Sequence, residues 1–299
     1  MRIETLIYGI YPRSDRLRLE YGRLERGVET TEKIKDIIRE EKSNFYQMTK
    51  GINFVTDPLF NWYDVFRSIS LSVDGISLGP LRRYLETNTF YREPEITRLG
   101  ELKLDVLEPL EFEDNPPFPM FQNDHRGVLP IFPEPSSMYS MSSVSPEVGE
   151  KEFSLKLLKI YDRIAGQFNS GQIVIFSPKA TYQNMEIYKE LSSSRQLFLV
   201  LNESVKEGSF ENLSFKFESI IVPDKKYLDL AQNNSIKPGL QMLDSHNTRI
   251  ETVEELKKEL LTIENATGIK NLIVTHRDYM DFLPRTIADR KVKILKEMN

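Results

Sequence analysis

The sequence contains no cysteine among its 299 residues. This absence excludes disulfide bonds and any metal site that uses thiolate ligands. No apolar run approaches the roughly 20 residues that a membrane-spanning helix needs. The first residues carry an acidic side chain and lack the long apolar core of a signal peptide. We therefore expect a cytoplasmic protein that does not interact with a membrane.

Neither sign of charge dominates the sequence. Lysine and arginine together number 40, aspartate and glutamate 45, and the formal net charge is −5. Surfaces that bind nucleic acids or anionic membranes are usually basic, so the composition predicts neither partner. Apolar residues make up 39% of the chain and charged residues 28%, which is typical of a globular protein with a substantial core. We expect one domain that spans residues 1–299.

Short apolar runs alternate with longer helical patterns along the chain. Each run is too brief for a helix and is flanked by turn residues, as expected for a strand of a parallel sheet. This alternation predicts an α/β fold, a (β/α)8 TIM barrel, with an irregular β and loop insertion around residues 93–125. Residues 132–146, rich in Pro, Ser and Met, are expected to form a long loop or a mobile segment at the rim. The eight predicted strands are centred on Thr5, Ile52, Val128, Ile173, Leu197, Phe215, Leu240 and Leu272.

The last two predicted strands run into clusters of ionisable residues. The first is followed by Asp244 and His246, and the second by His276, Arg277 and Asp278. In a β/α barrel, the carboxyl ends of the strands form the rim where functional residues gather. Two of the three histidines in the chain therefore fall where a site is expected.

Motifs spread along the chain resemble those of one family, the cobalamin-independent methionine synthases and the archaeal short forms related to them. They are YGIYPR at residues 8–13, the aromatic turn at 57–64, ETNTFYREP at 86–94, GVLP at 127–130, DSHNTR at 244–249 and LPR at 283–285. The match runs in order over nearly the whole chain, and its character is closest to the zinc-less N-terminal barrel of the full-length enzymes. The resemblance implies a TIM barrel and methyl transfer from methyltetrahydrofolate, or a related donor, to homocysteine.

The zinc site that the resemblance implies is altered in this sequence. The family's ligands, a His-x-Cys pair, a glutamate and a second cysteine, turn the homocysteine thiol into a nucleophilic thiolate. The corresponding positions hold Asn202, Glu218 and Asp278, so only the glutamate is retained. Because the nitrogen and sulfur ligands are missing, we expect no metal or other cofactor, and zinc only if this alignment is wrong.

The residues that would bind the amino acid differ as well. Ile10, Leu59 and Phe176 stand where the family has a serine, a glutamate and an aspartate. A zwitterion needs polar or charged partners when it leaves water. The resemblance therefore predicts a chain that does not activate homocysteine and that has no catalytic residue.

Two other uses of the rim residues stay open. The first use is a metal site with oxygen and imidazole ligands, such as a non-haem iron site, formed by His246, His276, Glu218, Asp244 and Asp278. The same residues are also compatible with a hydrogen-bonded network that holds no metal. The second use is a pterin or folate site, because aromatic rings stack on a flat pterin and arginines pair with carboxylates. The single tryptophan is equally compatible with an aromatic plug at the barrel mouth. The substrate-binding candidates are Arg13, Arg16, Arg18, Trp62, Tyr63, Asp64, Asn88, Arg92, Asp244 and His246.

These features favour a protein of methionine biosynthesis that works as a non-catalytic subunit of the N-terminal type. In this hypothesis it helps to bind the methyltetrahydrofolate-type methyl donor beside a separate catalytic methionine synthase barrel. The alternatives are an active stand-alone homocysteine S-methyltransferase, which would hold a metal tightly, and a purely structural or regulatory pseudoenzyme, which would bind no donor.

Overall fold

The structure is a computed structural model of the 299-residue chain. The residues that it describes are 1–85, 87, 89–102, 109–112, 115–119, 128–168, 170–179, 185–203, 210 and 213–299.

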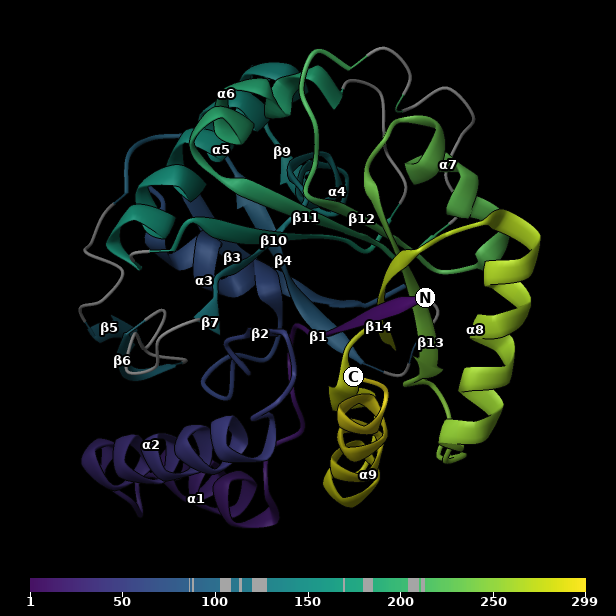
Figure 1. The fold of residues 1–299 in the computed structure, drawn as a ribbon. Coiled ribbons are helices and arrows are strands. Elements are labelled where there is room, and N and C mark those ends of the chain that lie inside the picture. Colours follow the sequence, from purple (N-terminus) through teal and green to yellow (C-terminus); the bar gives the residue numbers. More distant parts are fainter. Residues whose placement is uncertain are drawn as a thin grey trace.

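A parallel sheet that curves into a barrel forms the centre of the molecule (Figure 1). Its strands follow the order β7-β2-β1-β14-β13-β12-β11-β10-β8, and every neighbouring pair is parallel. Most of these strands are continuous apolar runs, as expected for strands that are buried on both faces. Their bounds are β1 (Arg2–Ile7), β2 (Phe54–Thr56), β7 (Val128–Leu129), β8 (Ile131–Pro133), β10 (Gln172–Ser177), β11 (Gln196–Leu201), β12 (Ser219–Val222), β13 (Lys237–Asp244) and β14 (Asn271–Arg277).

The barrel closes through one extended segment that Pro130 divides into β7 and β8. β7 pairs with β2, where Val128 lies opposite Val55, and β8 pairs with β10, where Ile131 lies opposite Val174. Proline has no N–H to donate, but the Pro130 carbonyl accepts from the Val174 N–H at 3.0 Å. The two ends of the sheet are therefore joined by a single strand, and the predicted (β/α)8 barrel is confirmed.

Helices cover the outside of the barrel (Figure 1). Several begin at side-chain caps: the Thr30 side chain accepts from the Lys33 N–H, and Thr252 and Glu255 form a capping box. The helices are α1 (Asp15–Glu25), α2 (Thr31–Met48), α3 (Val65–Ser72), α4 (Pro135–Ser140), α5 (Glu150–Gln167), α6 (Lys189–Ser194), α7 (Leu228–Asn233), α8 (Val253–Thr267) and α9 (Arg285–Glu297), with 3-10 turns η1 (Met185–Tyr188), η2 (Lys225–Tyr227) and η3 (Met280–Phe282).

A small mixed sheet, with one antiparallel and one parallel strand pair, interrupts the barrel pattern after α3. It contains β3 (Ile76–Arg83), β4 (Phe90–Ile96) and β9 (Ser143–Val144), and a second hairpin joins β5 (Pro109–Phe112) to β6 (Asn115–Pro119). The predicted irregular insertion around residues 93–125 thus begins earlier, at Ile76. Its residues 103–108, 113–114 and 120–125 lie outside the described part of the chain.

Three segment predictions are wrong. The strand expected around Ile52 begins two residues later, at Phe54. The strand expected around Phe215 is Ser219–Val222, so Phe215 precedes it. The alternation of residues 215–218 is typical of a half-buried strand, but the central parallel strand is the fully buried SIIV run that follows. Residues 132–146 are not a long loop, because α4 starts there, with Pro135 in its first turn and Glu134 accepting from the Ser137 N–H at 2.6 Å.

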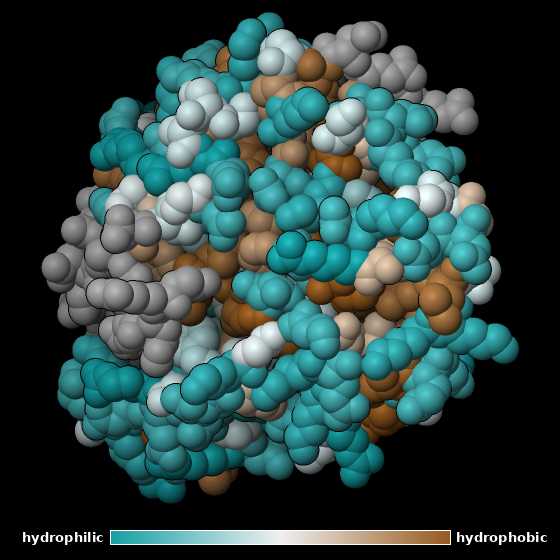
Figure 2. Space-filling view, viewed as in Figure 1, coloured by the Kyte–Doolittle hydropathy of each residue, from teal (hydrophilic) through white to brown (hydrophobic). Residues whose placement is uncertain are grey.

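The face shown in Figure 2 is mainly hydrophilic, and the apolar residues on it are interspersed with polar ones. Among the described residues, no helix is both long and apolar enough to cross a membrane.

Candidate functional site

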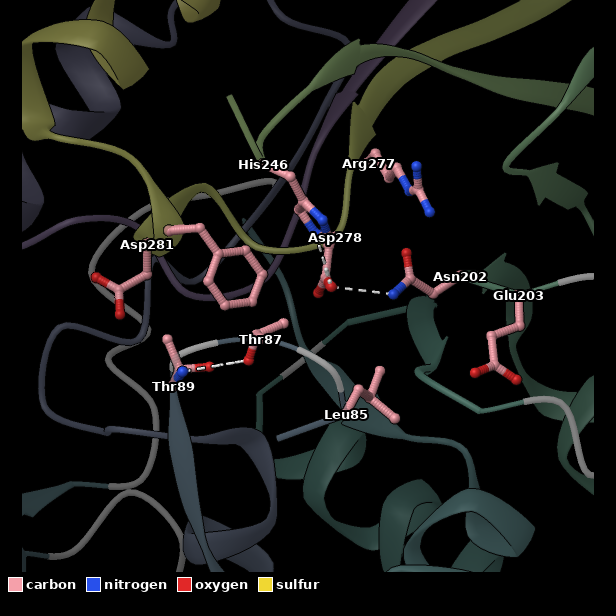
Figure 3. A pocket seen from close by; sticks show the side chains of 10 residues that line it. Leu85, Thr87, Thr89, Asn202, Glu203, His246, Arg277, Asp278 and Asp281 are labelled. Carbon is pink, nitrogen blue, oxygen red and sulfur yellow. Dashed lines mark hydrogen bonds and ion pairs between the residues drawn. The ribbon is translucent and has the colours of Figure 1, made fainter. Parts of the chain in front are cut away.

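Asp278 is the residue on which neighbouring side chains converge at the barrel rim (Figure 3). Asn202, which follows β11, donates from Nδ2 to Asp278 Oδ2 at 3.0 Å, and His246, in the turn after β13, places Nε2 3.2 Å from the same oxygen. The Tyr279 N–H donates to Oδ1 at 2.9 Å. Asp278 is fully buried and has a φ of +53°, a left-handed conformation that aspartate adopts more readily than most residues. Backbone strain at a rim carboxylate is a feature of functional sites.

His276 lies one layer deeper and is a core residue. Its Nε2 accepts from the Tyr8 N–H at 3.2 Å, so Nδ1 carries the proton and donates to the Asp278 carbonyl at 2.8 Å. The ring stacks on Tyr8, with centroids 4.4 Å apart. Burial of the imidazole lowers its pKa to about 4, and both ring nitrogens are already engaged. His276 therefore holds the rim backbone in place and does not face the pocket.

The buried imidazole predicts a loss of stability in weak acid. The unfolded chain protonates His276 near the ordinary pKa of 6.5, whereas the folded protein keeps it neutral down to about 4. The unfolded state therefore binds more protons between these values, and stability contributed by the neutral ring is lost as the pH falls through this window. We expect His276 to account for about 2 kcal/mol of lost unfolding free energy between pH 7 and pH 5. Urea unfolding at both values measures it, with His276→Gln as the comparison. An equal pH dependence in the two proteins would contradict the prediction.

A pocket of about 760 Å³, here called the Asp278 pocket, opens above this network. Arg277 and Glu203 lie on one side of it, and the side chains of Thr87 and Thr89 face them from the β3–β4 hairpin (Figure 3). It contains both cationic and anionic side chains together with an imidazole that a buried carboxylate orients, an arrangement able to bind a polar ligand and to exchange a proton with it. The lining residues are Leu85, Thr87, Thr89, Asn202, Glu203, His246, Arg277, Asp278, Asp281 and Phe282.

A second pocket of about 380 Å³, the Arg13 pocket, lies beside the first. The Arg13 guanidinium donates to the carbonyls of Phe60 and Trp62, at 2.6 and 2.7 Å. It also lies 4.1 Å from the ring centroid of Tyr63 and 5.0 Å from that of Tyr21. The pocket therefore combines a fixed positive charge with aromatic surface. It is lined by Arg13, Arg18, Tyr21, Gly22, Tyr63 and Asp281.

Asp281 belongs to both pockets and marks where they meet. Its surface is partly open, but the pocket walls desolvate the carboxyl group and raise its pKa to about 6. The positive charges of Arg13 and Arg18 oppose that rise. Desolvation therefore dominates the pKa of Asp281, and the arginines that line the Arg13 pocket offset part of the rise.

Several predicted binding residues serve the fold or lie outside both pockets. Asp64 caps α3, accepting from the Phe66 and Arg67 N–H groups at 2.9 and 2.7 Å, and burial raises its pKa. Arg16 forms an exposed ion pair with Glu40 at 2.8 Å.

The remaining candidates divide in the same way. Arg92 donates to the Gly79 carbonyl at 3.3 Å, and Asp244 closes a turn by accepting from the His246 N–H at 2.9 Å. Trp62 is buried and contributes its carbonyl to the Arg13 pocket. Asn88 lies outside the described residues. The structure thus brings together Arg13, Arg18 and Tyr63 in one pocket and places His246 in the other.

The donors at the rim do not fit the zinc site that the sequence resemblance implies. Asn202 offers an amide and Asp278 one carboxylate, and the two are hydrogen-bonded to each other. Glu218 is not with them: it precedes β12 and so lies at the amino end of the barrel, 3.0 Å from Lys237 Nζ, which also binds Glu4 at 3.0 Å. Glu218 was expected at the rim because the sequence placed a strand around Phe215, before the actual strand β12. In the part of the chain that the structure describes, no three His, Asp or Glu side chains are grouped so that they could hold a metal ion.

The main residues that sequence reasoning missed are Asp281 and Phe282. Both follow Asp278 in the loop after β14. Because this loop was expected at the rim, its position could have indicated that they line a pocket. Thr87 and Thr89 were also missed, although they flank the candidate Asn88 in the motif at residues 86–94, because the sequence did not predict the hairpin that carries this motif to the rim.

Comparison with known proteins shows the fold of the chain. No protein-family model and no curated protein matches the sequence. Among solved structures, a B12-independent methionine synthase from Shewanella sp. W3-18-1 in complex with selenomethionine is similar, with a TM-score of 0.66 and 10% identity over 100% of this chain and 97% of that one. A putative vitamin-B12 independent methionine synthase from Listeria monocytogenes matches with a TM-score of 0.68 and 11% identity over 99% and 97% of the two chains. At these identities, the likeness establishes a shared barrel fold along the whole chain.

Proposed function

We propose that this protein is a methionine-synthase-like barrel of methionine biosynthesis that works as a non-catalytic subunit. In this role it helps to bind the methyl donor, methyltetrahydrofolate or a related pterin, beside a separate catalytic barrel that activates homocysteine. The similarity to the two methionine synthase structures supports the biosynthetic context.

The observation that carries the proposal is the pair of pockets that meet at Asp281. The Arg13 pocket offers Tyr63 for stacking and the charges of Arg13 and Arg18 for the carboxylates of a folate. In the Asp278 pocket, the Asn202 amide and the Tyr279 N–H donate to the Asp278 carboxylate, and the described residues include no group of metal ligands that would activate the thiol of homocysteine. The geometry thus supports donor binding better than thiol activation.

A stand-alone homocysteine S-methyltransferase is the second candidate. It is favoured by the 3.2 Å contact between His246 and the buried Asp278, because an oriented imidazole at a pocket is able to transfer protons during a reaction. A structural or regulatory pseudoenzyme that binds no donor is the third.

Titration of the protein with methyltetrahydrofolate tests donor binding, with Trp62 as the single fluorescent tryptophan. We expect saturable quenching in the native protein. Arg18→Met should weaken the binding about tenfold or more, since a charged hydrogen-bond partner is worth roughly 1.5–3 kcal/mol. Arg16→Met is the matched control, because Arg16 lies in the same helix but pairs with Glu40 outside the pocket. Unsaturable quenching in the native protein would favour the pseudoenzyme.

Elemental analysis and a turnover assay separate the subunit from the stand-alone enzyme. We expect the purified protein to contain no stoichiometric zinc and to give no methionine from homocysteine and methyltetrahydrofolate unless a catalytic barrel is added. Tightly held zinc together with turnover by the protein alone would overturn the proposal.

A further inference from the structure

Glu251 connects helix α9 to the turn that carries His246. Its Oε2 accepts from Lys291 Nζ at 2.6 Å, and its Oε1 accepts from the Asp244 N–H at 3.1 Å. Lys291 is fully buried although it belongs to an otherwise amphipathic helix, and the Glu251 side chain is 13% exposed. A buried ammonium group needs such partners, so this contact is specific.

Lys291 also holds the far end of the same loop. Its Nζ donates to the Arg249 carbonyl at 2.6 Å, while Glu251 accepts from the N–H of Asp244, the last residue of β13 before the loop. Inside the loop, Asp244 Oδ1 accepts from the His246 N–H at 2.9 Å. The Lys291 ammonium group therefore holds one end of the loop directly and the other end through Glu251. The loop conformation fixes the backbone of His246.

We propose that Lys291 is a positioning residue for His246 at the Asp278 pocket, acting through Glu251 and the backbone of Asp244. The His246 side chain has two described contacts: its Nε2 lies 3.2 Å from Asp278 Oδ2, and its ring meets the Phe282 ring edge-on, with centroids 5.1 Å apart. These contacts need the turn to stay in place. Among the described residues, the polar contacts of Lys291 are with Arg249 and Glu251, which do not line the pocket, so its effect on the pocket passes through the loop. The use of the pocket rests on the proposed function, but the placing of His246 does not.

Proton NMR of the histidine rings tests this positioning directly, because the chain has only three histidines. In the native protein, we expect the Phe282 ring, 5.1 Å away between centroids, to shift the His246 ring resonance and to show cross-relaxation with it. Lys291→Met is expected to move that resonance toward the position of an exposed histidine and to weaken the cross-relaxation. Lys293→Met is the matched control, because Lys293 is exposed on the same helix. A loss of stability alone would leave the His246 signal of the folded protein unchanged.

Glu251→Gln provides a second variant should Lys291→Met not fold. A glutamine has one acceptor oxygen in place of two, so it cannot serve both Lys291 and the Asp244 N–H, and the same shift of His246 is expected. An unchanged His246 resonance in a folded Lys291→Met or Glu251→Gln protein would overturn the proposal. If methyltetrahydrofolate does not bind the native protein, the proposed function fails, while the His246 resonance still decides the role of Lys291.

Discussion

Lys42→Met is expected to lower the free energy of unfolding by about 3–5 kcal/mol, because it leaves a buried carboxylate without its counter-charge. Lys42 Nζ lies 2.6 Å from Asp57 Oδ2, and the two side chains are 3% and 0% exposed. Urea denaturation with linear extrapolation measures the loss. The double variant Lys42→Met with Asp57→Asn should lose less, since neither charge is then left alone.

Lys35→Met on the same helix is the control for this experiment. Lys35 pairs with Glu32, whose side chain is 79% exposed, so its removal should change stability by less than about 1 kcal/mol. A loss from Lys42→Met no larger than that from Lys35→Met would mean that the buried pair does not stabilise the barrel.

The Lys42–Asp57 ion pair is connected to the Arg13 pocket through the backbone of residues 59–62. Asp57 Oδ1 accepts from the N–H of Leu59, a residue with a φ of +52°, at 2.8 Å. The carbonyls of the next residues, Phe60 and Trp62, hold the Arg13 guanidinium. In the folded fraction of Lys42→Met, we therefore expect weaker binding of methyltetrahydrofolate as well.

Asp278→Asn is expected to cost about 2–4 kcal/mol and to abolish the fixed geometry of the Asp278 pocket. An asparagine has one acceptor oxygen where the carboxylate has two, so at least one of the buried donors, the Asn202 amide or the Tyr279 N–H, loses its partner, at about 1–3 kcal/mol for each unsatisfied group. Asparagine tolerates the positive φ of this position, so the backbone contributes little to the loss.

Chemical denaturation and ligand titration together check this prediction. Asp281→Asn serves as the control in the same loop, because Asp281 is exposed and, among the described hydrogen bonds, its side chain accepts from no buried donor; this substitution should lower the unfolding free energy by no more than about 0.5 kcal/mol. Equal stability of Asp278→Asn and the native protein would show that the rim network is not what fixes Asp278.

The barrel strands were predictable where both faces are buried, because such strands are continuous apolar runs in the sequence. β10, β11 and β14 are such runs, and their expected centres Ile173, Leu197 and Leu272 all lie within them. β12 was misplaced because the alternating residues before it imitate a strand with one polar face. The β3–β4 hairpin was missed because Gly79 and Pro80 interrupt an exposed edge strand that has no periodic apolar pattern.

The candidate site was predictable only in part, for a physical reason. The rim position of Asp278 and His246 follows from the ends of their strands, and both residues meet there. The contact of Asp64 with the Arg92 N–H and the contact of His276 with the Tyr8 N–H join segments that are distant in the sequence, so local patterns do not encode them. The same holds for Asp281, whose importance comes from lying between two pockets.

The pairing of β1 with β14 means that the first strand of the barrel completes its hydrogen bonds late in folding. Arg2 lies opposite Asn271, so the first strand finds one of its two neighbours only after nearly all of the sequence has been synthesised. Until then, one edge of β1 keeps unpaired N–H and C=O groups, which other chains are able to pair with. Contacts of such long sequence separation form slowly, so we expect closure of the barrel at β1 and β14 to be a late step of folding.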